Sequence, residues 1–141
     1  MRSPKLARRG QAVVEFALVL PLVLILVISV FEFARAWNIQ QVLTDAAREG
    51  ARVAVVGNGA GESAGAIQTN VEAAIDQALS VAGIDPSDAD LDLDGIGGGR
   101  GNPATVGLEL PYRFSFLGPL MGWTIGRSSL TLRTSITMRN E

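Results

Sequence analysis

The first residues that could do chemistry are a glycine and a glutamate five positions apart. Gly10 closes a basic stretch, and Glu15 stands directly before a long aliphatic run. A carboxylate in a membrane-spanning segment costs up to ~3 kcal/mol at the bilayer centre, so it is usually kept for a partner. If the chain were cut between Gly10 and Gln11, the new α-amino group would lie one helical turn before Glu15 and would supply a cation for it. The alternative is a glutamate tolerated at the membrane interface.

A second set of carboxylates lies in the stretch "DADLDLDGIGGGRGNP". Asp90, Asp92, Asp94 and Gly95 match the first half of an EF-hand loop, in which alternate carboxylates converge on calcium. The twelfth position of such a loop needs a glutamate, and here it is Gly101. We therefore expect a short edge strand with a solvated acidic face, and weak Ca²⁺ binding is the alternative. No other cofactor and no firm metal site is predicted.

A glycine pattern in "VVGNGAGESAGA" could indicate nucleotide chemistry. Gly59, Gly61 and Ala64 fit the G-x-G-x-x-A dinucleotide fingerprint. The segment before them has the pattern of a helix end rather than of a buried strand, and no parallel strand is evident after them. We expect a loop after a helix C-terminus instead.

Composition excludes several classes of function. The chain has no cysteine and no histidine, which removes thiolate nucleophiles, zinc–thiolate sites and histidine-dependent catalysis. No serine has a plausible base partner, so no enzyme is predicted. Four cations (Arg2, Lys5, Arg8 and Arg9) precede the aliphatic run, and the remainder has 8 basic and 14 acidic residues, which predicts no nucleic-acid partner.

The aliphatic run is the element that must position Gly10 and Glu15. From Gln11 to Phe31 the chain has 21 residues, which at ~1.5 Å rise per residue give roughly 30 Å, enough to cross a bilayer. The preceding cations predict a cytoplasmic N-terminus and an extracytoplasmic remainder. Phe31, Phe33 and Trp37 would mark the outer interface, where Glu32 and Arg35 are spaced to pair.

An ordinary secretory signal is the competing interpretation of this region. A basic start, an apolar run and the small-residue site Ala34-Arg35-Ala36 would release a soluble domain that begins at Trp37. The helical pattern continues through this site, which favours a retained anchor.

Beyond the membrane, residues 38–56 keep a helical period and predict an amphipathic stalk. Ala46, Gly50 and Ala54 form a ridge of small residues that allows close approach of another backbone, either of a second subunit or of the chain's own head.

Two further patterns predict a small head. A second amphipathic helix is expected over residues 64–82, followed by a stop signal. Alternating residues predict strands over 106–116 and 130–138, the first at a sheet edge or bulged because Pro111 lacks an N–H. Between the strands, the apolar "LGPLMGWTIG" is expected to fold back onto the core or to contact another subunit, through Leu120, Met121 and Trp123.

The N-terminal stretch "GQAVVEFALVLPLVLILVISVFEFARAWNIQQVLTDAAREGARVAVV" resembles the TadE-like family of pseudopilins of the tight-adherence pilus system, and its start resembles a class III prepilin signal. The resemblance covers Gly10 to about Val56. It implies that Gly10 and Gln11 flank the bond cut by a prepilin peptidase, and that Glu15 and Phe16 act in recognition and assembly. Implied partners are the peptidase, other pilin subunits, a membrane assembly platform and the lipid bilayer.

The expected architecture is a pilin-like α+β protein with a small antiparallel sheet of about three strands. Its parts are a basic leader (1–10), a transmembrane helix (11–36), a stalk helix (37–57) and an extracytoplasmic head (58–141). The resemblance implies a minor pilin of the cytoplasmic membrane that supports surface adhesion, because the major pilins of this system are much shorter. The alternative is a single-pass anchored binding module, with or without calcium binding, that has no pilus role.

Overall fold

A computed structural model describes residues 4–98, 101–126 and 128–139, and of residues 4–9, 120 and 125 it describes the backbone alone. The side chains of the leader cations and of Leu120 therefore lie outside the described part.

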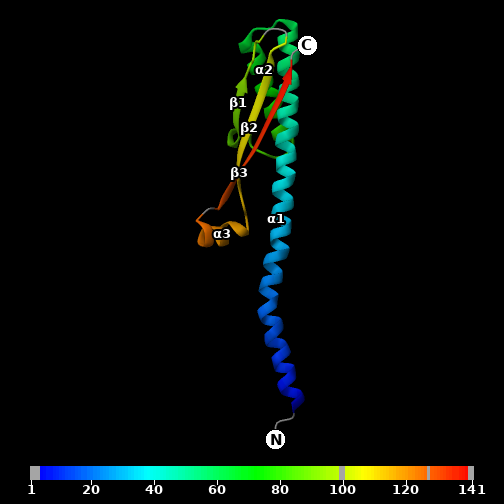
Figure 1. Cartoon of the computed structure of the whole chain (residues 1–141), viewed down its shortest axis with the longest axis vertical. Coiled ribbons are helices and arrows are strands. Elements are labelled where there is room, and N and C mark those ends of the chain that lie inside the picture. Colours follow the sequence, from blue (N-terminus) through cyan, green and yellow to red (C-terminus); the bar gives the residue numbers. More distant parts are fainter. Residues whose placement is uncertain (1–3, 99–100, 127, 140–141) are drawn as a thin grey trace.

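One helix runs along the whole length of the molecule (Figure 1). Helix α1 (Pro4–Ala60) has 57 residues, and the rest of the chain packs along its second half (Figure 1). The predicted transmembrane and stalk segments are thus one continuous helix. Its aliphatic side chains between Val13 and Val27 are exposed, since nothing in the described chain covers them.

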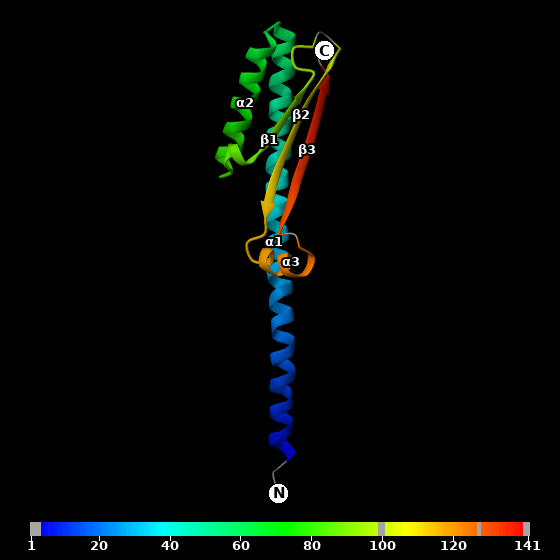
Figure 2. The ribbon, with the colours of Figure 1, turned by 90° about the vertical axis from the view of Figure 1, so that its left-hand side faces the viewer.

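The second helix, α2 (Ala64–Val81), lies antiparallel to the end of α1 across a short corner (Figure 2). The hydroxyl of Ser63 accepts the N–H of Ala66 and caps its start. Gly83 has φ 74° and ends it, with the N–H of Ile84 donating to the carbonyl of Leu79. The predicted range of 64–82 agrees with this helix because both of its ends are set by local residues.

The sheet is antiparallel and has the order β1-β2-β3. Its strands are β1 (Asp90–Asp94), β2 (Pro103–Arg113) and β3 (Ser129–Arg139), and a 3₁₀ turn, η1 (Pro86–Asp88), leads into β1. Leu93 pairs with Val106, and Val106 pairs with Ile136, so one face is apolar. The predicted α+β class and the three-stranded sheet are confirmed.

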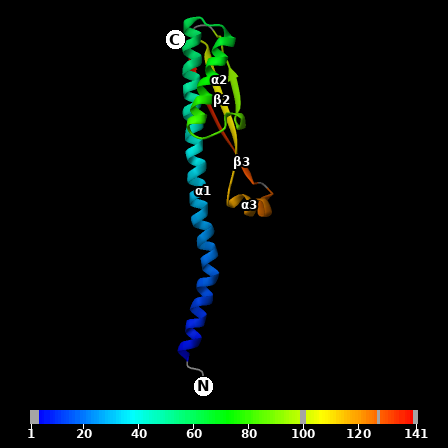
Figure 3. The same cartoon turned by 180° about the vertical axis from the view of Figure 1, so that it is seen from behind.

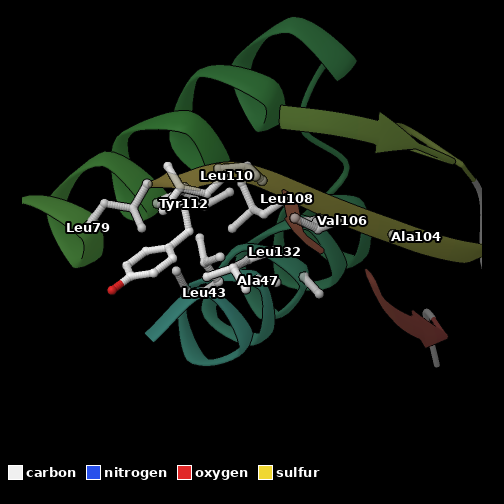
Figure 4. Close-up of a cluster of buried hydrophobic side chains, with 14 of the residues drawn as sticks. Leu43, Ala47, Leu79, Ala104, Val106, Leu108, Leu110, Tyr112 and Leu132 are labelled. Carbon is white, nitrogen blue, oxygen red and sulfur yellow. The ribbon is translucent and has the colours of Figure 1, made fainter. Parts of the chain in front are cut away.

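The core lies between α1, α2 and the apolar face of the sheet (Figure 4). Leu43 from α1, Leu79 from α2 and Leu108 from β2 are almost fully buried there. The core is confined to the head, so the stability of the fold depends on the second half of α1 and not on the exposed first half.

The expected place of Pro111 at a sheet edge is wrong for the strand as a whole, because β2 is the central strand. The pairing of β1 with β2 ends at Glu109, however, and Pro111 faces only Thr131 of β3. Pro111 therefore lies in the part of β2 that pairs with β3 alone, where the strand is locally an edge on its other side.

The segment between β2 and β3 also differs from the prediction. β2 ends at Arg113, so Phe114 and Phe116 are not strand residues, and the helix α3 (Leu117–Ile125) follows. Trp123 does not fold back onto the core: it is 86% exposed, while Met121 is half-buried. Figure 3 shows α3 apart from the rest of the head, beside the middle of α1.

Candidate processing, membrane and stalk segment

The glycine and the glutamate that were singled out in the sequence lie on the exposed N-terminal part of α1. The Nε2 of Gln11 donates to the Oε1 of Glu15 at 2.9 Å, so these two side chains share a face one helical turn apart. No heavy atom lies within 4 Å of the position that a Cβ would take on Gly10. The described part of the chain therefore leaves Gly10 uncovered, and Phe16, next to Glu15, is 64% exposed.

The apolar surface that follows Glu15 fits one pass across a membrane. Among the described residues, α1 is the one helix that is long and apolar enough to span a bilayer. Exposed aliphatic side chains on all sides of a helix are favourable in lipid and unfavourable in water. The predicted single span is therefore consistent with the length and the surface of α1.

At the head-side end of this surface, a buried carboxylate joins α1 to the start of α3. Glu32 is 4% exposed, and its two oxygens accept the backbone N–H groups of Ser115 at 3.0 Å and Phe116 at 3.3 Å. Phe116 is the N-cap residue of α3 and Ser115 directly precedes it, so the carboxylate lies at the N-terminus of the helix, where the helix dipole also favours a negative charge. Glu32 thus caps a helix that is distant in the sequence.

Arg35 does not pair with Glu32, although the spacing of the two residues allows such a pair. Its Nη1 instead donates to the Oγ of Ser115, at 3.5 Å. Sequence reasoning missed the capping role because spacing along one helix shows only local pairs. An acidic residue on an otherwise apolar face was the signal available.

The ridge of small residues on the stalk packs against the chain's own head. Ala46, Gly50 and Ala54 are buried. A Cβ on Gly50 would lie 2.8 Å from the Cδ1 of Ile75 in α2, so these helices approach closely because Gly50 has no side chain. The ridge is therefore occupied within one chain.

The polar side of the stalk carries two exposed ion pairs. Arg48 contacts Asp45 at 3.0 Å, and the Nε of Arg52 donates to Glu49 at 2.9 Å. The hydrogen bond from Arg52 lowers the pKa of Glu49 below its usual value. Exposed pairs of this kind contribute little to stability, and they keep this face of the helix hydrated.

The three aspartates of the half EF-hand lie on the edge strand β1, as the sequence predicts. Asp90, Asp92 and Asp94 all point to the exposed face of the sheet. Carboxylates two positions apart on a strand are held side by side rather than around one point. Within residues 4–98, 101–126 and 128–139, no group of three or more acidic side chains is placed to hold a metal ion.

The glycines of the nucleotide fingerprint lie at the corner between two helices. Gly59 is in the last turn of α1, Gly61 follows it with φ 76°, and Ala64 starts α2. The fingerprint requires a strand before the glycines, and α1 is there instead. The side-chain oxygen of Asn58 accepts the N–H of Gly97 at 2.8 Å, which fixes this corner to the turn after β1.

Comparison with known proteins gives one match. The family model described as TadE-like protein matches residues 10–52, which begin at Gly10 and run through the exposed apolar helix into the stalk. No curated protein and no solved structure matches the chain significantly. Over residues 10–52, about the first third of the chain, the protein is therefore similar to the TadE-like protein family.

Proposed function

We propose that this protein is a non-enzymatic minor pilin that supports assembly of a tight-adherence pilus. One observation carries the proposal: the family match starts at Gly10, and an accessible Gly10–Gln11 bond precedes Glu15 by one helical turn on a helix fit to span a membrane. A pilus-associated role follows from the family. The role of minor pilin, the processing step and the adhesion that it supports are our proposal.

In the first step, a prepilin peptidase cuts the bond between Gly10 and Gln11. Hydrolysis leaves a carboxylate on Gly10 and an α-amino group on Gln11. Because Gly10 has the lowest helix propensity apart from proline, α1 opens there at little cost and the scissile bond can enter the enzyme.

In the second step, Glu15 pairs with the new amino group. The contact between the Gln11 and Glu15 side chains places the pair on one face of α1. The cation comes from the same chain or from an adjacent subunit, and in the second case it aligns neighbouring subunits in the membrane before they leave it. The pairing removes most of the cost of a carboxylate near lipid.

The head acts on the far side of the membrane as an adaptor or initiating subunit. In this arrangement the N-terminus is cytoplasmic, as the leader cations favour. The partners are other pilin subunits and a membrane assembly platform, and surface attachment is the cellular consequence.

The mature N-terminus tests this proposal. The chain is expressed with and without its peptidase, and the membrane fraction is analysed by intact mass and terminal sequencing. A start at Gln11 that depends on the peptidase supports the proposal. A start at Met1 supports the anchored binding module instead, and a start at Trp37 supports a secreted domain.

A further inference from the structure

Helix α3 carries an unusual share of the apolar surface of the head. Among the described residues beyond the membrane segment, the large apolar side chains that are exposed are Trp37, Val56, Val81, Phe116, Trp123 and Leu130. Two of the three most exposed belong to α3 or its N-cap position, Trp123 at 86% and Phe116 at 73%. A cluster of this kind at one end of a domain indicates a surface that is covered in use.

An apolar groove separates α3 from α1. It has a volume of about 910 Å³, with Leu26, Val30 and Phe33 on the α1 side and Leu117 and Met121 on the α3 side. None of the described residues that line it is charged.

The one polar hydroxyl among these lining residues is Ser29, which donates to the carbonyl of Ile25 at 2.7 Å. The only other polar side-chain group in the described lining is the indole N–H of Trp37, so the lining is almost wholly apolar.

Along the axis of α1, this groove lies where the membrane boundary is expected. Its α1 wall runs from Leu26 to Trp37. Phe31 lies roughly 30 Å along the helix axis from Gln11, which is the thickness of the hydrocarbon core. Figure 1 shows α3 beside this part of α1, at the end of the head that faces the free half of the helix.

The composition of the segment that contains α3 also fits a position at the membrane boundary. Residues 114–126 contain no charged side chain, and arginines flank them at positions 113 and 127. Tryptophan and other aromatic residues are enriched at the interface between membrane and water, and flanking cations suit the headgroups. The strand carrying Asp90, Asp92 and Asp94 belongs to the sheet, away from α3 (Figure 2).

We propose that α3 is an interfacial anchor: it lies in the head-side leaflet, lipid acyl chains fill the groove against α1, and Trp123 and Phe116 enter the interface. Lipid is the occupant because Leu26 and Val30 belong both to the groove and to the exposed aliphatic surface of α1, which the membrane itself covers. The groove is thus continuous with the lipid-facing surface. The inference rests on the membrane span and is independent of cleavage at Gly10 or of any pilus.

Tryptophan fluorescence of the full chain tests this anchor. The chain has two tryptophans, so Trp37→Phe leaves Trp123 as the single reporter. The variant is reconstituted in vesicles of phosphatidylethanolamine and phosphatidylglycerol that contain a lipid spin-labelled either near the headgroup or near the chain end. We expect a blue-shifted emission, stronger quenching by the shallow label than by the deep one, and loss of quenching by acrylamide.

A reporter at the far end of the head is the matched control. Val56→Trp in the background Trp37→Phe/Trp123→Phe places a tryptophan on a site that is 59% exposed, and its emission should stay that of water with no lipid quenching. A water-like, lipid-insensitive Trp123 would overturn the proposal. So would a blue shift without lipid quenching that grows with the protein-to-lipid ratio, because that result would place a second copy of the chain in the groove.

Discussion

The Oε2 of Glu32 accepts the backbone N–H of Ser115 at 3.0 Å across 83 positions of sequence. The neighbouring oxygen accepts the N–H of Phe116, so one carboxylate holds the start of α3 onto α1. This contact sets the level of α3 relative to the membrane segment. Without it, α3 would be held beside α1 by the hydrogen bond from Arg35 to Ser115 and by apolar contacts alone.

Glu32→Ala should therefore loosen α3 more than the rest of the head. A hydrogen bond to a charged group contributes about 1.5–3 kcal/mol, and the substitution removes two of them. Hydrogen exchange of the Ser115 and Phe116 amides should become at least about tenfold faster, since 1.4 kcal/mol is a factor of ten. Exchange at Leu108, in the centre of β2, should change much less.

Glu49→Ala is the control on the same helix. Glu49 pairs with Arg52 on the exposed face of the stalk, and such pairs contribute at most about 1 kcal/mol. Equal effects of the two substitutions on the exchange of the Ser115 amide would refute the capping role.

Gly50→Ala should destabilise the head even though alanine favours helices. The added methyl would approach the Cδ1 of Ile75 to 2.8 Å in a well-packed site, and overpacking costs about 1–3 kcal/mol against a gain in helix propensity of about 1 kcal/mol. Thermal or denaturant unfolding of the detergent-solubilised chain measures the difference.

A second substitution shows whether the close approach is the cause. Ile75→Val removes the Cδ1 atom, so it should cost less stability in the Gly50→Ala background than in the natural chain. Gly65→Ala, in α2 with no atom within 4 Å of the added methyl, should be neutral or stabilising by up to about 1 kcal/mol. Additive effects of Gly50→Ala and Ile75→Val would contradict the packing argument.

The raised pKa of Tyr112 predicts that the folded head loses stability at alkaline pH. Burial and then the negative charge of Glu32 raise the pKa of Tyr112, and Arg35 opposes this shift. The unfolded phenol has a pKa of about 10, so the stabilisation is complete below that pH and is lost as the pH rises through the higher pKa of the folded state. Tyr112 is the only tyrosine in the sequence, so phenolate absorbance in the folded and the unfolded chain measures both values directly.

Tyr112→Phe should abolish this alkaline component. The hydroxyl is buried and has no hydrogen-bond partner in the described part of the chain, so its removal at neutral pH should be neutral or stabilising by up to about 1 kcal/mol. A loss of more than this at neutral pH would show that the hydroxyl has a partner.

Local patterns predicted the elements whose ends are set by their own residues. Helix α2 is an example, since Ser63 and Gly83 lie directly at its ends. The ridge of Ala46, Gly50 and Ala54 is only part of the buried face of the stalk. Ala47 and Ala51 are buried as well, because α1 is covered by α2 and also by the sheet. One ridge of small residues indicates packing against one neighbouring element, whereas α1 packs against two.

The sequence did not predict α3, for a physical reason. Its residues include Gly118, Pro119 and Gly122 and no polar stripe, so neither propensity nor periodicity favours a helix. Two tertiary contacts favour it: a carboxylate on another helix accepts the N–H groups of Ser115 and Phe116 directly before it, and an apolar surface lies beside it. The candidate processing site, by contrast, could be proposed from the sequence because its residues are close neighbours in the chain, from Gly10 to Phe16.

Glu15 is the residue on which the proposed assembly mechanism depends most directly. Glu15→Ala should insert and be cleaved as the natural chain is, because neither the aliphatic run nor the Gly10–Gln11 bond changes, yet cells that carry it should lack pili.

Glu15→Gln separates charge from hydrogen bonding, since glutamine can still accept the bond from Gln11 but cannot neutralise an ammonium group. If pairing with the new amino group drives alignment, Glu15→Gln fails as Glu15→Ala does, while Phe16→Leu, an apolar exchange at the neighbouring position, retains pili. Complementation of a deletion strain, with pili counted by electron microscopy and the mature N-terminus verified by mass, measures all three. Normal piliation with Glu15→Gln would show that the carboxylate charge is not what assembly requires and would leave Glu15 as a residue tolerated at the interface.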